Sequence, residues 1–248
     1  MIILHIAHNE LRRMFQSPLA WVVLAAVQFL LAMFFFLLLA RYLEPNPWSA
    51  ARGLTEVVVS GTFQIAGIVL LLVSPFLTMR LFSEEQRSGT IQLLLSSPVS
   101  LTQLVLGKFL GIFAFQLCIL CMIGLMPLAL ELGTRLDPGE VAAGVLGLTL
   151  LLAAFAAVGM FVSTLTAQPA VAAIGGFAVL FVLWIIHMAG QAGSERVAKV
   201  FEYASLLRHF NNLLDGFFSS ADVIYFLLLT ALFLALSVWR LDAVRVYR

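Results

Sequence analysis

Six long runs of apolar residues constrain the fold of this chain more than any other feature. A helix needs about 20 mostly apolar residues to cross the hydrocarbon core of a bilayer, and each run is close to that length or longer. Charged residues make up only 11% of the sequence, whereas a soluble domain carries about a quarter. We therefore expect an all-α integral membrane protein in which residues 1–248 form one transmembrane domain. The predicted transmembrane helices cover approximately residues 18–40, 61–79, 104–130, 141–165, 170–187 and 223–239.

The N-terminal segment, residues 1–17, is amphipathic rather than uniformly apolar. Apolar side chains such as Ile3 and Ile6 are interleaved with polar ones at helical spacing, which is typical of a helix lying in the membrane interface. The first crossing begins at Pro18 and is too long for the apolar part of a signal peptide. We therefore expect an N-terminal interfacial helix followed by a retained membrane anchor.

A second amphipathic segment, residues 191–221, lies between the fifth and sixth crossings. Its apolar residues recur at helical spacing among charged ones and predict an external amphipathic helix on the outer leaflet. Asp215 and Gly216 are expected to end that helix. Any of three residues can then cap the sixth crossing, namely Ser219, Ser220 and Asp222.

The distribution of Lys and Arg predicts the orientation in the membrane, because these residues are enriched in cytoplasmic loops. The side that would hold both termini and residues 80–103 carries eight of them. The other side carries six, of which three belong to the long segment 191–221. We therefore place both termini and residues 80–103 in the cytoplasm. A multi-pass protein of the bacterial cytoplasmic (inner) membrane is expected.

The sequence shows no constellation typical of an enzyme, a metal site or an ion-coupled carrier. Gly107 and Lys108 are followed by Phe109, where a phosphate-binding loop requires Ser or Thr. Cys118 and Cys121 lie in an apolar run without the His, Asp or Glu that would complete a metal site. The predicted crossings have no carboxylate near their centres, although proton- and ion-driven carriers usually need one. We therefore expect a non-catalytic membrane subunit with no metal or cofactor of its own.

Residues 80–103, between the second and third crossings, carry more polar chemistry than a membrane loop usually does. A short helix is expected to start near Thr90 and to end before Pro98, since proline cannot continue a helix. A charged elbow is expected ahead of this helix, formed by Glu84, Glu85 and Arg87. Such a segment either receives a soluble protein or rests on the bilayer with its charges solvated.

The same segment resembles the signature of ABC-2 type permeases, the membrane subunits of one class of ATP-binding-cassette (ABC) transporters. The matching pattern is Glu84-Glu85-Gln86-Arg87-Ser88-Gly89-Thr90, then Leu93-Leu94, then Pro98. The resemblance implies that residues 82–98 form a coupling helix that docks in a groove of an ATPase subunit. The coupling residues that it implies are Glu84, Glu85, Arg87, Gly89, Thr90, Leu93, Leu94 and Pro98. The preceding Thr78-Met79-Arg80 is most like the gliding-motility-type group of this family.

Small residues mark helix faces that can approach one another closely. Gly107 and Gly111 form such a face in the third crossing, and Gly175 and Gly176 form another in the fifth. We expect both faces to pack within one subunit. The resemblance further implies a permease dimer interface, formed either by the first crossing or by the fifth crossing with the external amphipathic helix.

The resemblance implies that the chain forms the membrane path as a dimer with a second copy or a paralogue. Cytoplasmic ABC ATPase subunits would bind ATP and Mg and drive the movement. The scarcity of charge in the crossings favours a lipid-like or amphiphilic substrate. Two alternatives remain open: a non-transporting scaffold that acts on an accessory subunit with a large external domain, and an ATPase-independent channel or carrier. The net charge of +1 gives no basis for nucleic-acid binding.

Overall fold

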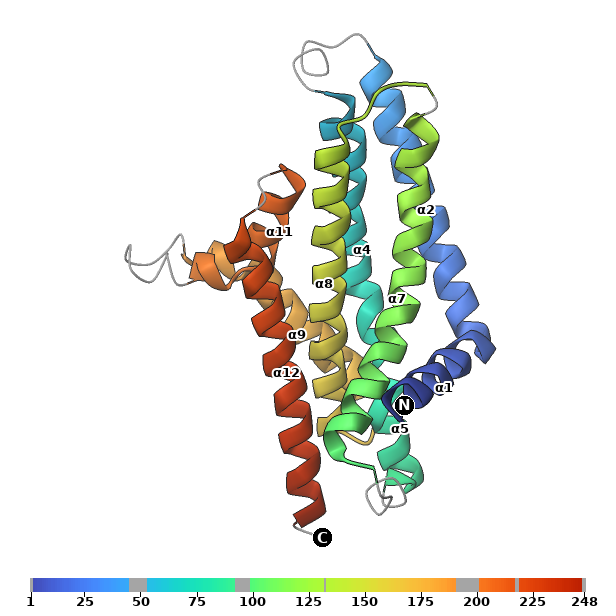
Figure 1. Cartoon of the computed structure of the whole chain (residues 1–248), viewed down its shortest axis with the longest axis vertical. Helices are drawn as coiled ribbons and strands as arrows, with labels where there is room; N and C mark the ends of the chain where they lie inside the picture. Colours follow the sequence, from blue (N-terminus) through green and yellow to red (C-terminus); the bar gives the residue numbers. More distant parts are fainter. Residues whose placement is uncertain are drawn as a thin grey trace.

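The computed structural model describes residues 2–44, 53–91, 99–131, 133–190, 201–216 and 219–246 (Figure 1). All regular structure in these ranges is helical, and six helical spans are long and apolar enough to cross a membrane. The predicted all-α integral membrane fold is therefore confirmed. The spans are α2 (Pro18–Leu43), the continuous η1, α4 and α5 (Thr55–Ser60, Gly61–Thr78 and Arg80–Ser88), α7 (Leu101–Glu131), α8 (Pro138–Leu165), α9 (Pro169–Gly190) and α12 (Ser220–Val246).

Proline determines where three of the crossings begin. Helices α2, α8 and α9 start at Pro18, Pro138 and Pro169, where the missing N–H would have had no partner within the helix. Ahead of α8, the Asp137 carboxylate accepts a 2.9 Å hydrogen bond from the Gly139 N–H. Because these signals are local in sequence, the predicted starts of these crossings lie close to the observed ones.

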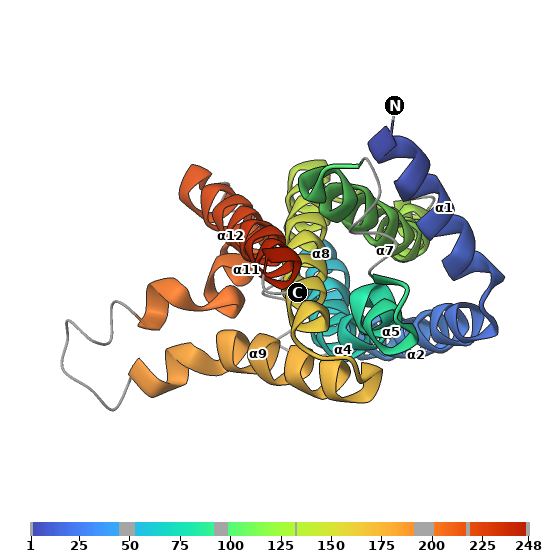
Figure 2. The same ribbon diagram turned by 90° about the horizontal axis from the view of Figure 1, so that it is seen from below.

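Helix α8 lies at the centre of the bundle and contacts α4, α7, α9, α11 (Leu206–Leu214) and α12 (Figure 2). Its middle is narrow because small residues follow one another there. A methyl group at Gly159 would collide with the side chain of Thr78 on α4. The backbones of α4 and α8 therefore approach closely at this point. The fully buried alanines of this stretch are Ala154, Ala156 and Ala157.

The two adjacent glycines of α9 face this central pair of helices. A Cβ atom added at Gly175 would lie 3.0 Å from Val162 Cγ1 on α8, and one at Gly176 would lie 3.5 Å from Pro75 Cβ on α4. Gly175 has little space for a side chain, whereas Gly176 has ordinary van der Waals room. The glycine face predicted in the fifth crossing thus lies against helices of the same chain.

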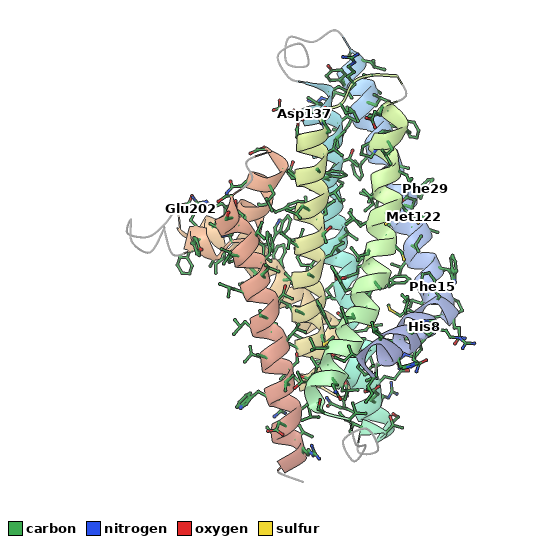
Figure 3. The ribbon with its side chains drawn as sticks, in the orientation of Figure 1. His8, Phe15, Phe29, Met122, Asp137 and Glu202 are labelled. Atoms are coloured by element: carbon green, nitrogen blue, oxygen red, sulfur yellow. The ribbon has the colours of Figure 1, made fainter. Side chains whose placement is uncertain are left out.

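Helix α1 (Ile2–Gln16) lies across one end of the bundle, outside α7 and α2 (Figure 2). The Phe15 ring meets the Phe115 ring of α7 edge-on, with centroids 5.2 Å apart. The Trp21 indole N–H donates a 2.8 Å hydrogen bond to the Phe15 carbonyl and fixes the corner between α1 and α2. Figure 3 labels His8 and Phe15 on this helix. We call this end of the bundle, which also holds α5, the α5 end.

Helix α11 (Leu206–Leu214) is amphipathic as predicted, but its apolar face packs on the bundle instead of facing lipid. It contacts α8, α9 and α12, and its buried apolar residues are Leu206, Phe210, Leu213 and Leu214. Gly216 has a φ of +75° and ends the helix at the predicted place. Figure 3 labels Glu202 beside this helix, and Asp137 on the part of the bundle that extends beyond it. Residues 191–200 and 217–218 of the predicted segment lie outside the described ranges.

Candidate functional site

The charged residues after the second crossing lie in a helix that continues that crossing. Only Met79 separates α4 from α5, and residues 55–88 form one span of 34 residues. The expectation of a charged elbow at Glu84, Glu85 and Arg87 is therefore wrong. No proline or glycine occurs between Pro75 and Gly89, so nothing in the sequence breaks the helix there.

Helix α5 has one face turned to the protein and one turned outward. Leu81, Phe82 and Ser83 are buried, whereas Arg80, Glu84 and Arg87 are exposed. The Gln86 side chain donates a 2.9 Å hydrogen bond to the Thr164 carbonyl at the end of α8. Of the predicted coupling residues, Glu84 and Arg87 are thus available to another molecule.

Gly89 ends α5 in a conformation that other residues rarely adopt. Its φ is +73°, its N–H donates to the Gln86 carbonyl, and a side chain added there would meet no atom within 4 Å. The hydroxyls of Ser88 and Thr90 lie 2.8 Å apart just beside this turn. The other predicted coupling residues, Leu93, Leu94 and Pro98, lie outside the described ranges.

Glu85 points into the protein and belongs to a buried ionic cluster. The Lys108 Nζ lies 2.5 Å from Glu85 Oε1 and 3.7 Å from Glu10 Oε2, and it also donates a 2.7 Å hydrogen bond to the Leu81 carbonyl. The side chains of Lys108, Glu10 and Glu85 are only 4%, 8% and 13% exposed. Arg13 pairs with Glu10 at 2.8 Å and balances the charge. We call Glu10, Glu85 and Lys108 the ionic brace.

The ionic brace joins three helices that are far apart in sequence. Glu10 comes from α1, Glu85 from α5 and Lys108 from α7. The Lys108 ammonium also lies 5.0 Å from the centre of the Phe82 ring. Buried charges of this kind are costly unless each is paired, so the brace holds these helices in one relative arrangement.

Gly107 and Gly111 flank Lys108 in sequence and lie against α1. A Cβ atom at Gly107 would be 2.6 Å from Ile6 Cβ, and one at Gly111 would be 2.7 Å from Glu10 Cβ. These glycines allow α1 to approach α7 closely enough for Glu10 to reach Lys108. One signal of this cluster is visible in the sequence, namely a lysine inside an apolar helix, but this signal does not identify the partners of the lysine.

The sequence profile of a protein family described as ABC-2 family transporter protein matches residues 4–245. The chain belongs to this family. No curated protein matches the chain. As an ABC-2 family member it is a multi-pass membrane subunit of a transporter, and membership implies an ABC ATPase subunit as its partner.

This ABC-2 family protein has a second buried polar cluster, away from the α5 end and where α11 meets α12, that the sequence did not predict. His209 on α11 lies with its Nδ1 2.5 Å from Asp222 Oδ1 on α12 and its Nε2 2.8 Å from the Tyr203 carbonyl oxygen. The Tyr225 ring stacks on the imidazole, with centroids 4.0 Å apart. Asp222 therefore fastens α11 to α12 through His209, in addition to standing at the start of α12.

The described residues of this ABC-2 family protein contain no group of three or more His, Cys, Asp or Glu side chains that could hold a metal ion. A polar contact inside the membrane span links α2 to α7, where the Gln28 side chain donates a 3.3 Å hydrogen bond to the Met122 carbonyl. Figure 3 labels Met122 on α7 and Phe29 on the neighbouring α2. The polar chemistry that the structure shows at the α5 end is therefore ionic pairing.

Proposed function

We propose that the chain is the permease subunit of an ABC transporter and that its ATPase partner docks at the α5 end, through residues 82–98. The observation that carries this proposal is the junction of α5 with the bundle: α5 continues α4 and is joined by the ionic brace to α1 and α7. A force applied to α5 would therefore move several helices together. ATP and Mg would be bound by the partner.

We propose two different roles for the predicted coupling residues. Glu84 and Arg87 are exposed and would contact the ATPase, while Gly89 would set the direction in which the chain leaves α5. Glu85 would transmit the movement through Lys108 instead of touching the partner. Leu93, Leu94 and Pro98 keep the docking role that the resemblance implies.

Coupling would proceed by rigid-body motion. Dimerisation of the ATPase subunits on ATP binding would displace α5, and the brace would carry α1 and α7 with it, as in other transitions in which packed helices shift between two arrangements. The narrow contact between Thr78 and Gly159 would pass the displacement to α8. The membrane path would open or close between subunits as these helices move.

A dimer with a second copy or a paralogue fits the exposure of two crossings. Only 17% of the apolar core of α2 and 28% of that of α9 are buried within the chain, and α12, at 22%, is similarly exposed. Of these three crossings, the resemblance assigns α2 or α9 to the permease interface. The substrate class that we propose, lipid-like or amphiphilic, follows from the apolar character of these faces.

We further propose that the protein resides in the bacterial inner membrane with both termini in the cytoplasm, which the excess of Lys and Arg at the α5 end supports. The Thr78-Met79-Arg80 sequence supports assignment to the gliding-motility-type group. A role as a non-transporting scaffold would use the same coupling surface. Co-purification of a membrane-anchored protein with a large external domain would favour the scaffold role.

The test is a pull-down of the tagged full-length chain from its native membrane in mild detergent, with identification of an ABC ATPase among the bound proteins. The Glu84→Lys/Arg87→Glu variant reverses the exposed charges and keeps Glu85 and the brace. We expect it to lose the ATPase while remaining folded and membrane-inserted. Arg12→Glu, an exposed change on α1 at the same end, is the matched control and should retain the ATPase. Retention of the ATPase by the charge-reversed variant would overturn the docking assignment.

A further inference from the structure

A large groove with an apolar wall and a basic end lies between α4–α5 and the start of α9. Its volume is about 1580 Å³, larger than the roughly 300–1,000 Å³ of most small-molecule pockets. A ligand with long flexible chains suits this size better than a compact metabolite. The lining residues that carry the argument are Leu72, Phe76, Arg80, Arg87, Ala170 and Ile174.

The wall of the groove is apolar where it runs along the transmembrane helices. Leu72 and Phe76 of α4 are 48% and 53% exposed, and Ile174 of α9 is 71% exposed. All three lie within spans that are long and apolar enough to cross the bilayer. This part of the groove is therefore a surface for hydrocarbon.

The other end of the groove is basic. Neither Arg80 nor Arg87 forms an ion pair with an acidic residue of the described ranges, although Glu84 lies one turn from each. The two arginines are seven residues apart, about 10 Å along the helix, and the flexible guanidinium groups can both reach an anion between them. Two arginines against one glutamate leave this end with a net positive charge.

The N-terminus of α9 adds to this positive field. Helix α9 is 22 residues long, and its first turn, including Pro169 and Ala170, lines the same end of the groove. The first N–H groups of a helix have no partner within it, and the helix dipole favours a negative charge beside them. No side chain of the described residues accepts a hydrogen bond from the Ala170 N–H. Two independent features therefore favour an anion at the same place.

We propose that this groove binds an anionic phospholipid of the leaflet at the α5 end. The phosphate lies between Arg80, Arg87 and the N-terminus of α9, and an acyl chain follows Leu72, Phe76 and Ile174 toward the membrane centre. The helix runs about 12 Å from Leu72 to Arg80. The apolar wall and the basic end of the groove therefore lie next to each other, as the acyl chain and the headgroup do in a lipid. A folded protein partner would not require this succession from hydrocarbon surface to positive charge. The inference does not rest on the proposed ATPase contact, but the two share Arg87, which can serve only one of them at a time.

The test uses the full-length protein, stripped of lipid in mild detergent and titrated with phosphatidylglycerol or with phosphatidylcholine of the same acyl chains. Native mass spectrometry counts the bound lipids. We expect tighter binding of phosphatidylglycerol. Arg80→Gln and Arg87→Gln should each weaken that binding about fivefold and leave phosphatidylcholine unaffected. Arg12→Gln, an exposed arginine of the same end that does not line the groove, should change nothing.

Three results would overturn the proposal. The first is equal binding of the two lipids, or full binding of phosphatidylglycerol by the Arg80→Gln/Arg87→Gln double variant. The second is loss of self-association by that double variant with unchanged lipid binding, which would make the groove an interface between copies of the chain. The third is competition by glycerol 3-phosphate at the concentration at which phosphatidylglycerol binds, because then the acyl chain would contribute nothing.

Discussion

Replacing Lys108 by methionine tests whether the ionic brace holds the α5 end together. Methionine keeps most of the apolar stem of the side chain but removes the charge that pairs Glu85 and Glu10. Glu85 then has no other cation within ion-pair distance among the described residues, and Glu10 retains only the half-exposed Arg13. Leaving a buried charge without its partner costs about 3–5 kcal/mol. Since 1 kcal/mol shifts the melting temperature of a chain of this size by about 2–4 °C, we expect a loss of about 10 °C.

The assay is the melting temperature of the purified full-length protein in mild detergent, followed by size-exclusion chromatography after heating. Arg12→Met, at an exposed position of α1, is the matched control and should shift the melting temperature by no more than about 2 °C. A triple variant, Glu10→Gln/Glu85→Gln/Lys108→Met, removes all three charges and should recover most of the loss, because the cost arises from unpaired charge. A single variant that melts with the wild type, or a triple variant no better than the single one, would refute the brace.

Three further predictions concern local contacts. Gly111→Leu forces a side chain against the Cβ of Glu10 and should lower the free energy of unfolding by about 1–3 kcal/mol. Gly124→Leu is the control and should be tolerated, because nothing lies within 4 Å of a Cβ atom there. Equal melting temperatures of the two variants would contradict the close packing of α1. Gly89→Ala should cost about 1–2 kcal/mol through its positive φ alone, with Gly89→Asn milder in the same melting assay. Asp222→Asn should weaken the contact between Asp222 and His209 and speed hydrogen exchange of the α11 amides, while the α1 amides keep their protection. Unchanged exchange in α11 would argue against a role of this contact in holding α11.

The transmembrane architecture could be predicted from the sequence because the bilayer itself sets the length and polarity of each crossing. Proline at the starts of α2, α8 and α9 predicts where these helices begin to within a few residues. The amphipathic periodicity of α1 and α11 was visible in the same way. These features depend only on neighbouring residues, which is why one sequence suffices to find them.

The contacts between distant helices could not be predicted in the same way. A lysine in an apolar helix, such as Lys108, indicates a buried acidic partner. Its partners, Glu10 and Glu85, can be identified only once α1 and α5 are placed in space. The pairing of His209 with Asp222 depends on the turn at Gly216 and on the packing of α11 against α8. Charged residues after an apolar run are typical of a loop, so the sequence predicts a break between α4 and α5; none of these residues breaks a helix, and the two helices are continuous.

The long span from Thr55 to Ser88 has a mechanical consequence. Its close contact with Gly159 of α8 is at Thr78, which divides the span into an arm of about 15 Å toward Ser88 and an arm of about 35 Å toward Thr55 at the usual helical rise. If this helical span pivots at Thr78, a displacement at Ser88 is more than doubled at Thr55. Spin-label distances from Ser88 and from Thr55 to α8 would measure the ratio of the two displacements. A small movement of a bound partner would then appear as a larger one at the far side of the membrane.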